Sequence, residues 1–477
     1  MAENHNKLYI NGEWVETANT MDVIDPATGE VIAQVADADA SHAEQAVEAA
    51  HKAFPEWSKM AAGKRAKLMS KWYNLIMQNR NELATILTKE MGKPFMEAKG
   101  EIIHAADWVS WYAEEAKRVY GETIPANEEN KRITVIKQPV GVVSAITPWN
   151  FPAGMVTRKI APALAAGCTV VLKPAEQTPL TALKLVELAH EAGIPAGVLN
   201  LIISSRPAEV GDVLTQDKRV RKVTFTGSTE VGKLINRNAA ATVKRVSLEL
   251  GGHAPFIVFE DADIKRAARG LVWTKYRNTG QTCICSNRVY VHASIADEFI
   301  AKFKDAVASL KLGHGLEEET SMGPLIDEEA VAKVDLHVKD AVEKGATLVC
   351  GGQRWGEKGF FYEPTILAGV TDDMRIATEE TFGPVAPIFT FETEEEVLGR
   401  ANNSDFGLAA YVYTQNLGRA IRMQEGLEYG IVGVNDPLPA GAVQAPFGGF
   451  KESGLGREGG HFGLDVFLEV KYISTMF

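Results

Sequence analysis

An apolar strand turns directly into a helix at the stretch Phe225-Thr226-Gly227-Ser228-Thr229-Glu230-Val231-Gly232. Gly227 permits the tight turn, and Ser228 can cap the helix that follows. Gly232 removes a side chain where that helix meets the sheet. The N-terminus of such a helix favours a phosphate group. The glycine spacing differs from the dinucleotide fingerprint, so the stretch taken alone is better explained as an ordinary strand–turn–helix connection.

An alternation of strands and helices extends on both sides of this stretch. Residues 142–146 and 169–172 are predicted to be buried strands, 181–192 a helix, and 245–250 a further strand. Repeated β-α alternation predicts a mostly parallel sheet with helices on its faces. The alternation begins again after Gly251, so we expect a domain boundary there.

The two ends of the chain show other patterns. A capping box, Ser41-His42-Ala43-Glu44, predicts the start of a helix, and 62–91 and 95–119 are predicted helical regions after a short strand region over 8–35. Residues 466–472 alternate apolar and polar side chains, which predicts a strand. An apolar strand without a neighbour leaves a bare edge, so we expect it to pair with another subunit; pairing within its own chain is the alternative.

Length and charge exclude several classes of protein. A chain of 477 residues is too long for one hydrophobic core, so two or three domains are expected. The net charge of −12 and the lack of a basic stripe argue against nucleic-acid binding. Four cysteines do not form a disulfide framework, and no signal peptide or membrane-spanning run is evident. We therefore expect a soluble protein of the cytoplasm.

Three residues that lie far apart in the sequence predict covalent chemistry on a thiol. Cys283 follows a Gly-Gln-Thr turn signal and is a candidate nucleophile, with Glu249 as a base and Asn150 as an oxyanion donor. Taken singly, Glu249 is better explained as a strand residue facing solvent, and Asn150 as a turn residue. Cys283 and Cys285 lack the further ligands that zinc requires, so no metal site is predicted.

A lysine and a glutamate follow the predicted strand 169–172. Ligands of open α/β sheets bind beyond the carboxyl ends of the strands, where Lys173 and Glu176 lie. A carboxylate there can accept both hydroxyls of an adenosine ribose, and it would repel a 2′-phosphate. The alternative is a solvated lysine in a proline turn.

The order and separation of these motifs resemble the aldehyde dehydrogenase superfamily over essentially the whole chain. The matching stretches are 147–152, 172–176, 225–232, 249–252, 280–283, 380–384 and 446–449. The resemblance implies an α/β fold with a Rossmann-type NAD-binding domain, an α/β catalytic domain, and a β-stranded oligomerisation arm with the C-terminal tail. These parts are expected over 1–120 with 140–250, over 251–447, and over 121–139 with 448–477.

The resemblance also implies a role for each site residue. Cys283 attacks the aldehyde carbonyl, and the side chain of Asn150 and the backbone N–H of Cys283 hold the oxyanion. The thiohemiacetal gives a hydride to the nicotinamide, and Glu249 activates the water that hydrolyses the thioester. The implied cofactor-binding residues are Trp149, Lys173, Glu176, Gly227, Ser228, Gly232, Glu380 and Phe382. Relatives that prefer NADP often have a small residue at the position of Glu176, so NAD is expected to be preferred, with NADP possible.

Within the superfamily, the runs 155–159, 275–288 and 456–459 are most similar to succinate-semialdehyde dehydrogenases. That resemblance implies that Arg158 and Arg277 bind the carboxylate of a small anionic aldehyde, because a guanidinium offers paired donors. It also implies a reversible, inhibitory disulfide between Cys283 and Cys285, and a homodimer or homotetramer without membrane or nucleic-acid partners.

One loop departs from the subfamily pattern. The loop 435–445 is about one residue longer than usual, and the serine that normally gives a third carboxylate contact has no clear match. Sulfolactaldehyde or glutarate semialdehyde therefore remain alternative substrates. Glu249 argues against a CoA-acylating dehydrogenase, which needs no water-activating base, and Cys283 with Asn150 argues against a non-enzymatic binding protein.

Overall fold

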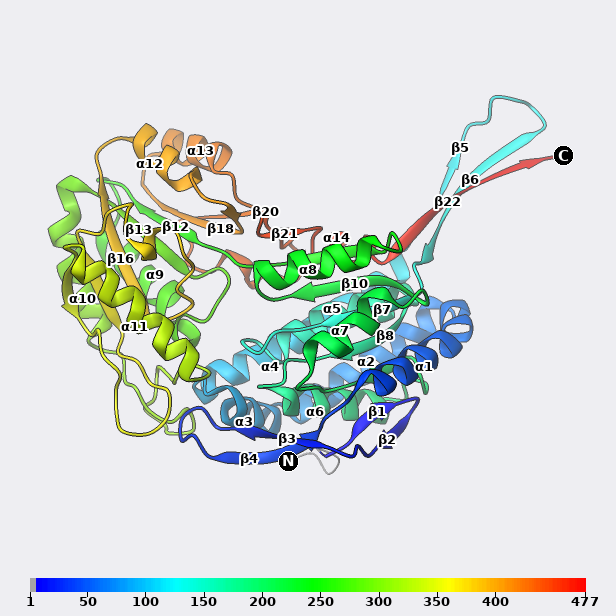
Figure 1. Cartoon of the computed structure of the whole chain (residues 1–477). Helices are drawn as coiled ribbons and strands as arrows, with labels where there is room; N and C mark the ends of the chain where they lie inside the picture. Colours follow the sequence, from blue (N-terminus) through cyan, green and yellow to red (C-terminus); the bar gives the residue numbers. More distant parts are fainter. Residues whose placement is uncertain (1–5) are drawn as a thin grey trace.

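The computed structural model describes residues 6–477 and builds them around two large sheets (Figure 1). Residues 1–5 of the expected NAD-binding domain lie outside the described part. The first sheet has five parallel central strands flanked by antiparallel ones. Its order is β2 (Glu13–Val15), β1 (Leu8–Ile10), β9 (Leu199–Leu201), β8 (Thr169–Lys173), β7 (Val142–Ile146), β10 (Val220–Thr226), β11 (Arg245–Glu249) and β21 (Gly454–Leu455).

Eight helices belong to the part of the chain that forms this sheet. They are α1 (Ala40–Lys59), α2 (Ala62–Gln78), α3 (Arg80–Met91), α4 (Phe95–Glu115), α5 (Gly154–Ala166), α6 (Pro179–Glu191), α7 (Pro207–Gln216) and α8 (Thr229–Ala240). The predicted cap of α1 at Ser41 is wrong by two residues, because the carboxylate of Asp39 accepts the backbone N–H groups of Ser41 and His42. The predicted helical region 62–91 divides at Asn79 into two helices.

The second sheet is parallel except at β14. Its order is β14 (Thr347–Cys350), β15 (Thr365–Ala368), β16 (Val385–Phe391), β13 (Ser286–His292), β12 (Ala254–Val258), β18 (Ala409–Tyr413) and β19 (Ile431–Val434). One face packs against α9 (Ile264–Tyr276) and α10 (Ala296–Val307). The other face packs against α11 (Glu328–Glu343), α12 (Glu394–Asn402) and α13 (Leu417–Gly426). Helices on both faces explain why the strands β12, β13, β16 and β18 inside this sheet are buried almost throughout.

The chain passes between the two sheets more than once. It crosses from β11 to β12 over 250–253 and returns to the first sheet at β21. The remaining short elements are β3 (Thr20–Ile24), β4 (Val31–Ala36), β17 (Phe406–Gly407), β20 (Phe450–Lys451), α14 (Phe462–Asp465), η1 (Ala116–Arg118), η2 (Arg277–Gly280), η3 (Ala293–Ile295), η4 (Arg375–Ala377) and η5 (Pro439–Gly441). These repeated crossings bring residues from both ends of the chain to the same junction.

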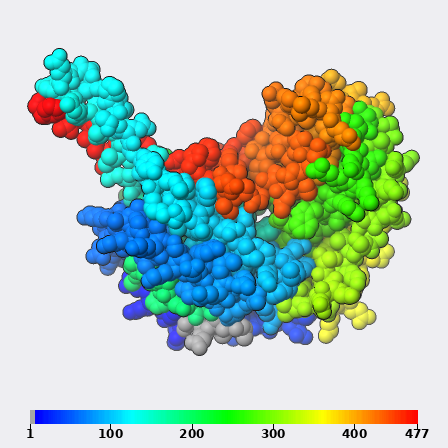
Figure 2. Space-filling model, turned by 180° about the vertical axis from the view of Figure 1, so that it is seen from behind, coloured from blue at the N-terminus to red at the C-terminus, as the bar shows by residue number. Residues whose placement is uncertain are grey.

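A three-stranded arm stands out from the rest of the molecule (Figures 1 and 2). It consists of β5 (Glu122–Ile124), β6 (Lys131–Pro139) and β22 (Leu468–Met476). β22 pairs antiparallel with β6 along its whole length, from Leu468 opposite Pro139 to Met476 opposite Lys131. The terminal strand therefore pairs along one edge within its own chain, and the expected pairing with another subunit stays a prediction. Its second edge has no partner strand in residues 6–477.

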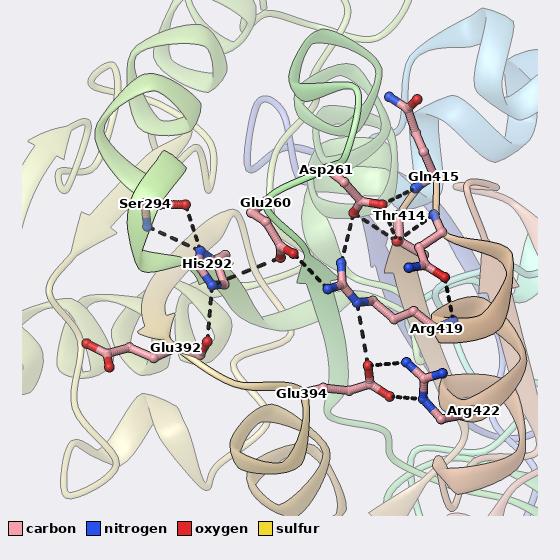
Figure 3. A network of polar contacts seen from close by, with 11 residues as sticks. Glu260, Asp261, His292, Ser294, Glu392, Glu394, Thr414, Gln415, Arg419 and Arg422 are labelled. Carbon is pink, nitrogen blue, oxygen red and sulfur yellow. Dashed lines mark hydrogen bonds and ion pairs between the residues drawn. The ribbon is translucent and has the colours of Figure 1, made fainter.

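A network of ion pairs links α13 to α12 and to the segment that follows β12 (Figure 3). Arg419 of α13 contacts Glu260 at 2.7 Å and Asp261 at 3.0 Å, just beyond the end of β12. Arg422 contacts Glu394 of α12 at 2.7 Å. Networks of this kind hold element ends in place more effectively than isolated surface pairs.

Candidate active site

A cavity of about 650 Å³ lies where α4, α5 and η2 meet. Cys283 forms part of its wall. The side chains that carry charge or can donate a hydrogen bond from this wall include Lys93, Glu97, Glu101, His104, Arg158 and Arg277. Aromatic residues fill much of the remaining wall, as is typical of sites for small molecules.

The loop before Cys283 has an unusual backbone. Asn278 and Thr279 both adopt left-handed φ angles, 51° and 58°, and a β-branched residue rarely does so. Asn278 Nδ2 donates to the carbonyl of Asn150 at 3.0 Å, and Thr279 Oγ1 donates to the carbonyl of Gly323 at 2.9 Å. Gln281 Oε1 accepts the backbone N–H of Ile326 at 2.9 Å. The loop is thus fixed to segments near both sheets.

Cys283 is half-buried and its sulfur is a free thiol. Burial raises its pKa to about 12, while the nearby Arg158 guanidinium acts in the opposite direction. A neutral thiol is therefore the resting form of Cys283 at neutral pH. Gly252 permits close approach of the chain after β11, because a Cβ there would lie 2.2 Å from the Cys283 carbonyl oxygen.

Asn150 lies buried beside the cysteine loop. Its Nδ2 donates to the carbonyl of Gln281 at 3.0 Å, two residues before Cys283. Its own carbonyl accepts from Lys93 Nζ at 2.9 Å, so side chain and backbone are both held. An amide carries two N–H groups, and one of them is used in this bond to Gln281 within residues 6–477.

Glu249 ends β11 and points inward. It pairs with Gly454 of β21, and its side chain is buried, so the solvent-facing alternative from the sequence is wrong. Its Oε2 has no hydrogen-bond partner within residues 6–477. Burial raises its pKa well above the usual range, and the neighbouring carboxylate of Glu458 adds to this effect. A buried carboxyl with a raised pKa can act as a general base near neutral pH.

Arg158 lies on α5, a helix that is buried along its whole length. Its Nε lies 2.6 Å from Glu458 Oε2, and its guanidinium stacks 3.7 Å from the centre of the Phe447 ring. Lys159 Nζ contacts the other oxygen of Glu458 at 2.6 Å. Although burial opposes it, these two cations together hold the pKa of Glu458 below its usual range.

Arg277 has a different environment at the end of α9. It is half-buried, lies 5.2 Å over the Phe151 ring, and has no ion pair within 4.0 Å in the described part of the chain. Its backbone neighbour Asn278 donates its N–H to Glu97 at 2.9 Å. The structure therefore brings Arg158, Arg277 and Cys283 to one cavity, as the sequence predicted for a site that binds an anion.

The proposed cofactor residues form a second group, outside this cavity wall. Lys173 ends β8, and its Nζ contacts Glu176 Oε2 at 3.1 Å. Ser228 caps α8 by accepting the N–H of Val231 at 3.3 Å, as predicted. The side chain that Gly232 lacks would meet Leu250, with a Cβ 2.3 Å from Leu250 Cδ2.

Glu380, Phe382 and Trp149 lie at the junction of the two sheets. Glu380 Oε1 accepts the N–H of Gly252 at 3.1 Å, and burial raises the pKa of Glu380 to about 7. Phe382 has a left-handed φ of 53°, and its ring packs edge-on against Trp149 at 5.5 Å. A strained backbone at such a junction is often kept because it aims a side chain.

Cys285 and the loop 435–445 complete the comparison with the sequence. Cys285 is buried, and its Sγ lies 3.7 Å from the Lys275 carbonyl. Both Cys283 and Cys285 are free thiols in the structure. The loop contributes Leu438, Ala440 and Gly441 to the cavity wall, none of which carries a hydroxyl.

Three polar residues near the site were given no role from the sequence. Lys159 and Glu458 lie next to motif residues. Because they pair across 299 positions, no local sequence pattern indicates their contact. Adjacent cations in an otherwise apolar helix would have been a clue to Lys159. His104 lines the cavity from α4, where a single histidine on a helix predicts nothing specific.

Two other kinds of feature are absent from residues 6–477. No helix there is both long and apolar enough to cross a membrane. No group of three or more histidine, cysteine, aspartate or glutamate side chains there is placed to hold a metal ion.

A family model for the aldehyde dehydrogenase family matches residues 14–473, and the chain belongs to that family. Among its relatives is the glutarate-semialdehyde dehydrogenase of Pseudomonas putida KT2440, 54% identical over 98% of this chain and 97% of the relative. The NADP(+) succinate-semialdehyde dehydrogenase GabD of Escherichia coli K12 is 52% identical over 97% and 96%. A 3-sulfolactaldehyde dehydrogenase of Pseudomonas putida is 53% identical over 98% and 96%.

Solved structures give the same family. An NADP-dependent enzyme of Escherichia coli superposes with a TM-score of 0.98 at 50% identity, covering 100% of this chain and 99% of the other. The betaine aldehyde dehydrogenase of Staphylococcus aureus in complex with NAD+ has a TM-score of 0.96 at 40% identity, with 99% and 95% covered. The α/β fold expected from the sequence is therefore confirmed.

Proposed function

We propose that the protein oxidises succinate semialdehyde to succinate with NAD(P), and that Cys283 forms the covalent intermediates. This proposal rests on one observation: a cysteine thiol, Arg158 and Arg277 line the same cavity. The thiol supplies the nucleophile for an aldehyde, and the guanidinium groups supply donors for a carboxylate at the other end of a short substrate. The relatives are named for glutarate semialdehyde, succinate semialdehyde and 3-sulfolactaldehyde, which supports the same class of substrate.

The reaction divides among residues of this chain. Cys283, once deprotonated, adds to the carbonyl carbon, and the free N–H of Asn150 with the Cys283 N–H stabilises the developing oxyanion. A bound nicotinamide would supply the hydride acceptor for this oxidation. Glu249 then takes a proton from water, which attacks the thioester and releases the acid.

The residues that would hold the dinucleotide fit its chemistry. The uncovered N-terminus of α8, with Gly227 at the turn and Ser228 as cap, suits a pyrophosphate. Lys173 and Glu176 suit the adenosine ribose, while Glu380, Phe382 and Trp149 suit the nicotinamide end. The negative charge of Glu176 disfavours a 2′-phosphate, so we propose that NAD is preferred over NADP.

Initial rates over a panel of aldehydes test this function. Succinate semialdehyde, glutarate semialdehyde, sulfolactaldehyde and the neutral butanal are each compared with NAD and NADP, with Cys283→Ala as the inactive control. We expect the highest kcat/KM for succinate semialdehyde with NAD. A higher value for glutarate semialdehyde or sulfolactaldehyde would change the substrate, and a preference for butanal would refute the role of the arginines.

The domain roles are proposed on the same grounds. The first sheet and its helices bind the dinucleotide, and Cys283 lies three residues before β13 of the second sheet begins. The arm joins copies of the chain into a homodimer or homotetramer. Four free cysteines suit the reducing cytoplasm, where we place the enzyme.

We propose that oxidation forms a disulfide between Cys283 and Cys285, which reversibly blocks activity. The two residues are separated by one residue, and Cys285 must leave its contact with the Lys275 carbonyl to reach Cys283. Mild peroxide should inactivate the enzyme, and dithiothreitol should restore it. If Cys285→Ser is inactivated and restored to the same extent, no such disulfide forms.

A further inference from the structure

The loop 435–445 gives the cavity no hydroxyl that could serve as a third contact for a substrate carboxylate. The loop presents only the apolar wall of Leu438, Ala440 and Gly441. Arg158 is also partly committed, because its Nε contacts Glu458 at 2.6 Å. A carboxylate has about four acceptor positions on two oxygens, so a substrate tail held by these arginines still has room for another donor.

His104 lines the same cavity as both arginines. Its ring packs edge-on against Trp108, one turn further along α4, with ring centres 5.5 Å apart. The guanidinium of Arg158 in turn lies 5.2 Å from the centre of the Trp108 ring. His104, Trp108 and Arg158 therefore form one continuous surface facing the cavity.

The ring nitrogens of His104 are free to bind a ligand. No hydrogen bond to either nitrogen is formed by another residue in the described part of the chain. Burial, followed by the charges of Arg158 and Arg277, lowers its pKa to about 4, so the ring is neutral at neutral pH. A neutral imidazole keeps one N–H donor.

Two other polar side chains of the cavity, those of Lys93 and Tyr276, are already engaged in contacts within the chain. Lys93 Nζ contacts Glu101 at 2.6 Å and donates to the Asn150 carbonyl. The Tyr276 hydroxyl donates to the carbonyl of Thr365 at 3.0 Å. His104 is thus an uncommitted donor in the cavity that also holds the two guanidinium groups.

We propose that His104 donates a ring N–H to the anionic tail of the substrate and is the third tail contact, beside Arg158 and Arg277. This inference rests on the proposed function, because it requires a substrate with an anionic tail. It assigns the contact to helix α4 instead of the loop 435–445.

Two substitutions separate hydrogen bonding from packing. His104→Phe keeps a ring against Trp108 and removes the donor, whereas His104→Gln restores an N–H donor of similar reach. kcat and KM are measured for succinate semialdehyde and for butanal, a neutral aldehyde with the same number of carbons. Melting temperatures check the fold, and His104→Leu replaces the phenylalanine variant if that ring is not accommodated.

We expect His104→Phe to lower kcat/KM for succinate semialdehyde about tenfold, mainly through KM, as the loss of a hydrogen bond to a charged group predicts. Butanal should change less than about twofold, and His104→Gln should recover most of the loss. Equal losses for both aldehydes, no loss for succinate semialdehyde, or no recovery with glutamine would overturn the inference. If the wild-type enzyme itself does not prefer succinate semialdehyde to butanal, the proposed function fails instead.

Discussion

Arg158 and Arg277 carry the same charge but are held in different ways. Arg158 is enclosed in α5, stacked on Phe447 and paired with Glu458. Arg277 stands at the cavity rim without an ion-pair partner within residues 6–477. The first arginine therefore contributes to the fold as well as to the cavity, while the second is available for a ligand.

Replacing each arginine with glutamine should reveal this difference. Arg277→Gln should raise KM for succinate semialdehyde at least about tenfold and leave the melting temperature unchanged, because one charge-assisted contact is lost. Arg158→Gln should raise KM and also lower the melting temperature by several degrees, since a buried carboxylate loses a partner. Steady-state kinetics and thermal melts of both variants measure this. Equal melting temperatures for the two would contradict the structural role of Arg158.

The raised pKa of Glu249 predicts the pH dependence of turnover. A base works only when deprotonated, so turnover should rise with pH through a pKa well above that of an exposed glutamate, about 4.3. Glu249→Gln should keep the first burst of reduced cofactor and lose steady-state turnover by about a hundredfold or more. Stopped-flow absorbance separates the two phases. Loss of the burst to the same degree would move Glu249 to the first chemical step.

Strand β10 contains a buried cation that has no carboxylate partner within 4.0 Å in the described residues. Lys222 is 1% exposed, donates to Ser247 Oγ at 2.6 Å, and has a pKa lowered to about 7, mainly by burial. Its unfolded pKa is about 10.4, so the unfolded chain binds more protons between these values. Stability should therefore rise with pH across this window, because the native state holds the neutral amine.

Lys222→Met tests that contribution. We expect the melting temperature to rise by about 2 °C or more at pH 6.5, as relief of the buried charge outweighs the lost hydrogen bond to Ser247. The gain should shrink at pH 9, where the wild-type lysine is already neutral. Lys218→Met, at an exposed position, is the control and should change little. A gain that does not depend on pH would show that charge is not its cause.

Local patterns predicted some features of the site and left others open. β-α alternation and the turn at Gly227 predicted the parallel strands, because both depend on short-range periodicity. The partner of the terminal strand was not predicted. Alternation indicates which side chains share a face of a strand, but it does not indicate which strand lies beside it. The pairing of Arg158 with Glu458 was missed because the two residues lie 300 positions apart in the chain.

At the scale of the whole molecule, the arm presents apolar side chains to solvent. Val470 is 68% and Tyr472 is 59% exposed, and both lie on one face of β22. The second edge of β22 is also free of partner strands in residues 6–477. Exposed apolar residues on an open strand are typical of a surface that contacts another chain.

Charges on that face should separate the copies of the chain. A Val470→Glu, Tyr472→Glu double variant should elute with a smaller mass than the wild type in size-exclusion chromatography with light scattering. Lys471→Glu, on the opposite face, serves as the matched control and should leave the mass unchanged. A wild type that is already monomeric, or a double variant of unchanged mass, would exclude the arm as the contact.

The backbone before Cys283 sets a limit on how this enzyme can vary. Two consecutive left-handed residues store about 1–3 kcal/mol of strain each, and three hydrogen-bonded side chains keep them in place. Asn278, Thr279 and Gln281 have no part in the proposed chemistry, yet most replacements there would release the loop and displace the sulfur. In a library of random variants selected for growth on the aldehyde, these positions should be nearly as intolerant as Cys283 itself. The evolution of this site is therefore constrained by the backbone conformation of this loop as much as by the chemistry of Cys283.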